Sequence, residues 1–187
     1  MAVDRLTELQ HLIAADRRRM HVLALVRDLG LPDCWVGAGF VRQCVWDHLH
    51  SCTSSPMPQD IDVIWFDAQR CLAETDAALE QALRAQDDTL GWSVKNQARM
   101  HRRNADSPYG SASDAMRYWP ETATAVGVRL GPQGAIEVSA PHGLADLFDL
   151  VVRPTPRFAA DKHTIYRERI RSKDWKGKWP RLRIEGA

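Results

Sequence analysis

The sequence lacks the long apolar segments that mark membrane and secreted proteins. Its 187 residues contain no uninterrupted apolar run of about 18 residues, the length that a membrane-spanning helix requires. The first ten residues, MAVDRLTELQ, are charged and helix-forming, unlike the apolar core of a secretory signal peptide. We therefore expect no membrane span and a cytoplasmic location.

Cysteine is scarce and is not spaced for a structural zinc site or a disulfide framework. The four cysteines (Cys34, Cys44, Cys52 and Cys71) are separated by ten, eight and nineteen residues, and no C-x-x-C pair occurs. Zinc sites and small disulfide-rich domains are recognised by closer, paired spacings. We expect four free thiols.

The sequence also lacks a strong net charge, because a basic segment and an acidic remainder nearly cancel each other. The formal net charge is +1, yet residues 162–183 carry nine Lys or Arg against two acids, and the remainder has a net charge of −6. A basic tail of this kind either contacts a polyanion or folds back onto the acidic body. Trp175 and Trp179 lie within this tail. Their rings either stack on nucleic-acid bases or pack against the domain and hold the tail to it.

What the sequence does contain indicates one globular domain of helices and strands. Apolar residues make up 44% and charged residues 26%, and the length suits a single domain of about 100–200 residues. We predict a single domain over residues 1–187, with a helical segment at 1–30 and a basic C-terminal helix and tail at 158–187. The order of elements predicts an α+β fold, or a mixed-sheet α/β fold.

Apolar periodicity and turn residues predict the individual elements. One or two helices are expected over residues 4–29. The expected elements up to residue 119 are strands at 34–36 and 60–66, helices at 40–50 and 69–86, a strand from Trp92 to about His101, and a short helix at 113–119. After them we expect a β-hairpin formed by 123–130 and 135–140, a short helix followed by an extended piece within 143–154, and a last helix at about 158–173.

A glycine turn joins the first predicted strand to the helix that follows it. Gly37 and Gly39 flank Ala38, and Arg42 lies one turn into the helix. Glycines at such a turn let the backbone approach a phosphate, and the helix N–H groups then face the anion. Arg42 could reach the same anion, or it could instead form an ion pair with Asp47.

Two acidic residues share one face of the next apolar strand. Asp60 and Asp62 are two residues apart in DIDVIWF, so their side chains point to the same side. Adjacent carboxylates repel each other unless a cation neutralises them. Mg²⁺ prefers one or two carboxylates together with phosphate oxygens, which makes this pair a candidate metal site.

A polar cluster follows the start of the strand at Trp92. Strand alternation places Lys95 on one face, with Gln97, Arg99 and His101, and Asn96 on the other. Lys95 and Asn96 are candidates for substrate binding, and the alternative is a solvated strand face.

These motifs resemble the DNA-polymerase-β-like nucleotidyltransferase superfamily, in which a glycine-rich turn opens a helix and an Asp-h-Asp strand follows. AGFVRQ is similar to the Gly-Gly-x-x-Arg-Asp turn of the tRNA CCA-adding branch, with Gln43 where that branch has Asp. About residues 20–183 resemble an uncharacterised bacterial family of nucleotidyltransferase-like proteins. The stretches that carry this resemblance include WVGAGFVRQCVWDHLH, DIDVIWFD, YWPETATAVGVRL and RIRSKDWKGKWPRL.

The resemblance implies a polymerase-β-like fold, with a mixed β-sheet flanked by helices. It also implies a Mg²⁺-dependent nucleotidyltransferase that moves NMP from an NTP to a hydroxyl acceptor, which is a small molecule, an RNA or a protein. Gly37 and Gly39 would cradle the triphosphate, and Asp60 and Asp62 would hold Mg²⁺.

A third acid completes the superfamily pattern on a later strand. Glu137 in AIEVSA is the preferred candidate as a catalytic residue and metal ligand, and the other position is Ser93, where the acid would be missing. With Ser93 in that place, a nucleotide- or RNA-binding relative without transferase activity becomes the favoured alternative. An antitoxin-like partner protein of nucleotidyltransferase type is the third possibility.

Overall fold

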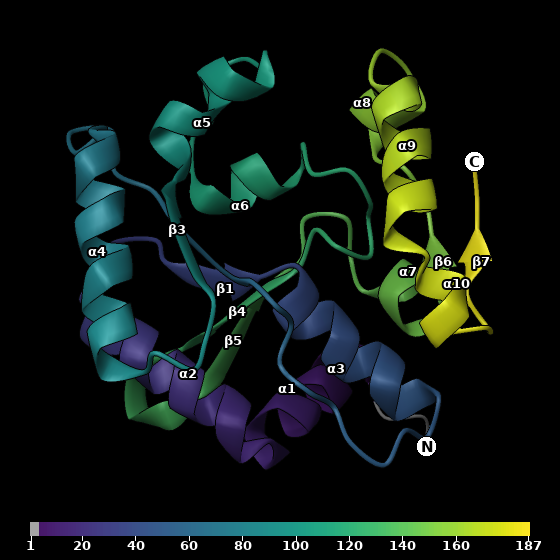
Figure 1. Ribbon diagram of the computed structural model, residues 1–187, viewed down its shortest axis with the longest axis horizontal. Helices are drawn as coiled ribbons and strands as arrows, with labels where there is room; N and C mark the ends of the chain where they lie inside the picture. The colour runs from purple at the N-terminus through teal and green to yellow at the C-terminus, as the bar shows by residue number, and fades with distance from the viewer. Residues whose placement is uncertain (1–3) are drawn as a thin grey trace.

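The computed structural model describes residues 4–187 (Figure 1). Its elements are α1 (Arg5–Ala15), α2 (Arg17–Asp28), β1 (Trp35–Gly37), α3 (Gly39–Leu49), β2 (Ile61–Trp65), α4 (Ala73–Gln86), β3 (Trp92–Asn96), α5 (Gln97–Asn104), α6 (Ala112–Met116), β4 (Gly127–Leu130), a 3₁₀ turn (Pro132–Gly134), β5 (Ile136–Ser139), α7 (Ala145–Phe148), β6 (Val151–Val152), α8 (Pro156–Ala159), α9 (His163–Lys173), α10 (Trp175–Lys178) and β7 (Arg183–Ile184).

A five-stranded mixed sheet in the order β3-β2-β1-β4-β5 forms the centre of the fold. β2 and β3 are parallel, whereas the other neighbouring strands are antiparallel. The predicted hairpin is the β4–β5 pair. The α+β expectation is therefore confirmed.

Helices lie on both faces of this sheet (Figure 1). Ile61, Val63 and Trp65 point from β2 into the main core, to which α1, α2 and α3 contribute. Ile64 points the other way, into a smaller cluster with Ala112 of α6. Strand alternation places Asp60 and Asp62 on that second face.

Helix α4 covers the exposed edge strand β3. A carboxylate oxygen of Glu80 accepts a hydrogen bond from the backbone N–H of Val94 at 3.3 Å, and Asp76 accepts from that of Asn96 at 3.0 Å. These side chains satisfy edge groups that another strand would otherwise bind.

Several predicted element boundaries are wrong, among them those of the strand from Trp92 and of the last helix. The strand from Trp92 ends at Asn96, because the Asn96 side chain accepts a hydrogen bond from the N–H of Ala98 at 3.0 Å and so caps α5. The last helix is divided into α8 and α9. At the other end of the chain, a cap formed by Asp16 separates α1 from α2.

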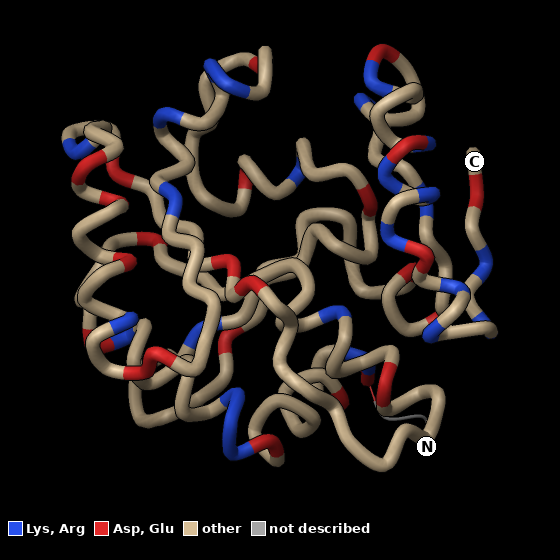
Figure 2. Tube along the Cα trace, viewed as in Figure 1, with Lys and Arg blue, Asp and Glu red and all other residues tan. Residues whose placement is uncertain are grey.

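The C-terminal tail folds back onto the body of the protein. The rings of Trp175 and Trp179 pack edge-on against Trp46, with centroids 5.6 and 5.1 Å away. The indole N–H of Trp179 donates to Asp47 Oδ1 at 2.8 Å. Both tail rings are buried, so they clamp the tail and do not form an exposed stacking surface. Basic positions recur along α9 and the turn after it (Figure 2).

All four cysteines are free, with Cys34 and Cys44 buried and Cys52 and Cys71 exposed. Between residues 4 and 187, no helix is both long enough and apolar enough to cross a membrane.

Candidate active site

A cleft of about 470 Å³, here called the first cleft, opens where β1 turns into α3. Residues from distant parts of the sequence line it. Its polar walls include Gly39, Arg42, Asp60, Asp62, Arg169 and Lys173. Of the residues predicted from the sequence, the structure brings four together here: Gly39, Arg42, Asp60 and Asp62.

The two aspartates lie where strand β2 begins. The backbone N–H of Ile61, between them, donates to the carbonyl of Gly91 at 2.6 Å. A side chain at residue 91 would collide with the Gln59 carbonyl oxygen, so this close strand approach needs glycine. Burial raises the pKa of Asp62, and the neighbouring Asp60 raises it further, while Arg42 acts in the opposite direction. A cation between the carboxylates would relieve this repulsion.

The turn before α3 has an unusual backbone conformation. Ala38 has φ +53° and ψ −123°, a backbone conformation that residues other than glycine rarely adopt. Its N–H donates to the Val126 carbonyl at 3.2 Å, which holds the turn against the start of β4. Among residues 4–187 no side chain caps α3, so its first N–H groups are available to an anion in the cleft.

Arg42 is a buried cation in the wall of the cleft. Its Nη1 donates to Thr124 Oγ1 at 2.6 Å, and its guanidinium lies over the Trp175 ring, 4.4 Å from the centroid. Its Nε has no hydrogen-bond partner among the described residues. Burial lowers the pKa of Arg42 to about 10, which leaves it charged at neutral pH. The alternative ion pair with Asp47 is not formed, because Asp47 contacts Trp179, Ser55 and Lys178 instead.

Helix α9 supplies two cations that the sequence analysis did not assign to the site. Arg169 and Lys173 are four residues apart, and both line the first cleft. Glu121, which is 1% exposed, accepts a hydrogen bond from Arg169 Nε at 2.6 Å. From their spacing, the sequence could have predicted that the two cations share one helix face, but not that this face meets Asp60 and Asp62.

A second cleft of about 240 Å³ adjoins the first and shares Ala38, Asp62 and Arg169 with it. The second cleft extends from Asp62 away from the first cleft, toward strand β3 and helix α5. Its remaining lining includes Ile64, Ser93, Lys95, Gln97, Met100, Asn104, Trp119 and Pro120. Lys95 is the only predicted binding residue that faces this cleft and not the first one.

Two predicted binding residues have structural roles instead. Gly37 is buried in β1, and a Cβ there would approach Trp119 and the Val126 carbonyl oxygen to 3.0 Å. Asn96 is fully buried, and its amide donates to the carbonyls of Asp67 and Arg70 at 2.8 Å. Neither residue lines either cleft.

Glu137 does not join the aspartates, so the expected convergence of three acids is wrong. It lies on β5, separated from β2 by β1 and β4, a span of about 14 Å at normal strand spacing. Its carboxylate accepts from Arg129 Nε at 2.6 Å. The residue paired with Asp62 on β3 is Ser93. Within residues 4–187, no group of three acidic, histidine or cysteine side chains is arranged to hold a metal.

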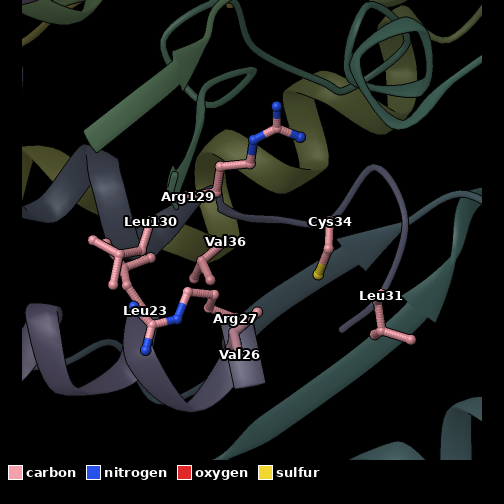
Figure 3. A pocket seen from close by; sticks show the side chains of 8 residues that line it. All are labelled: Leu23, Val26, Arg27, Leu31, Cys34, Val36, Arg129 and Leu130. Carbon is pink, nitrogen blue, oxygen red and sulfur yellow. The ribbon is translucent and has the colours of Figure 1, made fainter. Parts of the chain in front are cut away.

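A third cavity of about 100 Å³ lies between α2 and strands β1 and β4, away from the aspartates (Figure 3). Leu23, Val26 and Val36 make its apolar walls, and Cys34 lines one side. Burial raises the pKa of the Cys34 thiol to about 12. Because the thiolate is the reactive form, this cysteine is inert at neutral pH.

Solved structures share this fold. One, described as a protein whose NMR structure reveals a CCA-adding enzyme head domain, is 36% identical, with a TM-score of 0.85 over 97% of this chain and 96% of that one. A CCA-adding enzyme in complex with CTP is 15% identical, with a TM-score of 0.59. The Thermotoga maritima CCA-adding enzyme complexed with tRNA is 16% identical, with a TM-score of 0.57.

The chain matches almost the whole of the first of these structures but only part of the complete enzymes. It covers 43% of the enzyme with CTP and 42% of the Thermotoga maritima enzyme, and 95% of this chain is matched in each case. No protein of curated function matches the sequence significantly. A family described as nucleotidyltransferase matches residues 24–184. With that match spanning most of its length, the chain belongs to this nucleotidyltransferase family.

Proposed function

We propose that the protein binds a nucleoside triphosphate with Mg²⁺ in the first cleft and transfers the NMP to a hydroxyl acceptor. The observation that carries this proposal is the meeting of Asp60 and Asp62 with the uncapped start of α3 in one cleft. Membership of a nucleotidyltransferase family supports it, and similar structures contain CTP or ATP.

The donor groups suit Mg²⁺. Asp60 and Asp62 offer hard carboxylate oxygens, and burial together with the neighbouring charge of Asp60 raises the pKa of Asp62. Mg²⁺ commonly uses one or two carboxylates and takes its other ligands from water and substrate phosphates. These two residues would hold the ion, which when bound neutralises charge on the attacking and leaving oxygens.

The chain's own groups position the triphosphate. The first N–H groups of α3, beside Gly39, would bind phosphate oxygens, and Arg42 and Lys173 would add positive charge. The acceptor oxygen bonds to the α-phosphorus, and the bond from that phosphorus to the bridging oxygen breaks. Pyrophosphate leaves with the electron pair, and the hydroxyl proton passes to solvent.

Calorimetry of ATP, CTP, GTP and UTP binding with and without Mg²⁺ tests the site. We expect binding that strengthens with Mg²⁺ and loses that dependence in Asp62→Asn. Asp114→Asn, an exchange in α6 outside both clefts, is the matched control. Binding that is independent of Mg²⁺ and unchanged in Asp62→Asn would refute the metal site.

The position of Ser93 favours a second candidate, nucleotide binding without transfer. Ser93 pairs with Asp62 where the superfamily pattern has its third acid, so strand β3 adds no carboxylate beside Asp62. Pyrophosphate release distinguishes the two functions. Release from NTP and cell extract, lost in Asp60→Ala, supports transfer, whereas tight NTP binding without any release supports the binding function.

A further inference from the structure

We propose that the second cleft is the acceptor site and that it takes a small, uncharged, hydroxylated ring compound. This inference rests on the proposed function, since it needs a triphosphate in the first cleft. The two clefts meet at Asp62 and Arg169. In phosphoryl transfer the attacking and leaving oxygens lie roughly in line through phosphorus. With pyrophosphate leaving on the α3 side, the acceptor hydroxyl approaches from the second cleft.

The size of the second cleft limits what it can hold. Its volume of about 240 Å³ is below the roughly 300–1,000 Å³ typical of pockets for drug-sized ligands. Helices α5 and α9 stand on opposite sides of the space above the sheet (Figure 1). Lys162, just before α9, donates to the Asn104 carbonyl at 2.6 Å and to Asp106 at 2.9 Å. This link ties the two walls together, which favours a small compound over the end of a folded polymer.

Three side chains of the cleft offer oxygen atoms that can accept hydrogen bonds. The amide NH₂ of Gln97 donates to the Lys95 carbonyl at 3.1 Å, which leaves its Oε1 to accept. Tyr109 donates its hydroxyl proton to Asp106 at 2.5 Å and accepts from Asn104 Nδ2 at 3.1 Å. The Asn104 amide is thereby oriented, with Oδ1 left to accept. Together with the Asp62 carboxylate, these oxygens suit a ligand that donates several hydrogen bonds, as a polyol does.

The other walls suit the apolar face of a ring. Trp119, Met100 and Pro120 line the cleft. Both of its cations are already paired, Arg169 with Glu121 at 2.6 Å and Lys95 with Glu80 at 3.5 Å. With its cations neutralised, the cleft offers an anionic ligand little net attraction. A sugar-like ring combines hydroxyl donors with a flat C–H face and no charge.

Indole N–H spectra from NMR test this site directly. The probes are glucose, ribose and myo-inositol, each added to the full chain with Mg²⁺ and a non-hydrolysable ATP analogue. The Trp119 signal is identified by its loss in Trp119→Phe. We expect at least one probe to shift this signal, and Gln97→Met to weaken that binding about tenfold, the effect of one lost hydrogen bond. Gln86→Met, exposed on α4, is the control and should bind as the unaltered protein does.

A transfer assay supplies the second measurement. Cell extract is divided into small-molecule, RNA and protein fractions, and each is incubated with α-labelled NTP. Label in the small-molecule fraction supports the proposal, and label confined to RNA or protein overturns it. Absence of a Trp119 shift with all three probes also overturns it. NTP binding is measured by calorimetry in parallel. If only the acceptor-site proposal is wrong, NTP still binds in the first cleft. If the proposed function itself is wrong, NTP binding is absent as well.

Discussion

Buried Glu121 forms an ion pair with Arg169, a half-buried residue that lines both clefts. Glu121 Oε1 lies 2.6 Å from Arg169 Nε, and its other oxygen accepts from Thr124 Oγ1 at 2.7 Å. Thr124 in turn accepts from Arg42. One buried carboxylate thus fixes two of the cations of the candidate site, one directly and one through a hydroxyl group.

Glu121→Gln should weaken both the fold and nucleotide binding. The amide cannot balance the charge of Arg169, so we expect a loss of about 1–3 kcal/mol in the free energy of unfolding, measured with urea. NTP affinity should fall with it, because Arg169 is no longer held at the cleft. Glu168→Gln, an exposed exchange on the same helix, is the control and should change neither quantity.

Asp62→Asn should stabilise the protein in the absence of Mg²⁺, by an amount that depends on pH. Burial and Asp60 raise the pKa of Asp62 above its ordinary value of 3.8, so the folded state binds a proton more tightly than the unfolded state does. Stability therefore falls as pH rises from about 4 through the folded-state pKa. Melting temperatures should show a gain for the variant that grows over this range and is then constant. An equal gain at every pH would contradict this assignment.

Ala38→Gly should also stabilise the fold. The positive φ of Ala38 costs about 1–3 kcal/mol in the folded state, and glycine would remove this strain. The greater backbone freedom of glycine in the unfolded chain would offset about 0.4–1 kcal/mol of that gain. Urea denaturation should show a net gain of about 1 kcal/mol. Ala82→Gly, exposed within α4, should have the opposite sign, since glycine lowers helix stability there by about 1 kcal/mol.

Trp179→Phe should test whether the tail is needed to complete the first cleft. It keeps an aromatic ring against Trp46 but removes the N–H that Asp47 accepts, and we expect a loss of about 1–2 kcal/mol in stability. NTP affinity should fall as the wall loosens. Trp92→Phe removes a comparable hydrogen bond, to the Asp87 carbonyl, and its ring packs in the main core, on the face of the sheet opposite the clefts. An equal loss of NTP affinity in both variants would argue against a specific role for the tail.

Ser93→Asp should increase Mg²⁺ affinity in the presence of NTP. The new carboxylate would stand beside Asp62 on the neighbouring parallel strand. Without Mg²⁺ the added like charge should lower the melting temperature, and Mg²⁺ with NTP should more than restore it. Ser113→Asp, in α6, is the control. A variant that gains no Mg²⁺-dependent stabilisation would show that residue 93 does not face the metal.

The parts of the site that follow from the sequence are those that depend on neighbouring residues. The turn at Gly39 and the shared face of Asp60 and Asp62 rest on strand and helix periodicity, which is local. Asn96 shows the limit of prediction from periodicity. The sequence around it fits a continuous alternating strand, and it fits equally well a strand that ends at Asn96, with Asn96 capping the next helix. Only the hydrogen bond from the Ala98 N–H distinguishes them.

The third-acid assignment failed because it depends on strand order. Glu137 lies in a half-buried strand with apolar neighbours, a pattern that is the same wherever the strand sits in the sheet. Its separation from Asp62 by two intervening strands is a property of the topology. Arg169 was missed for a related reason, since no local pattern shows which distant surface a helix face will meet.

The folding back of the tail has a consequence for protein synthesis. The first cleft takes residues from α3 and also from α9 and α10, near the end of the chain. During translation, the sheet and the aspartates leave the ribosome well before Arg169, Lys173 and Trp179 do. A nascent chain therefore cannot form the complete nucleotide-binding cleft until translation has passed Trp179.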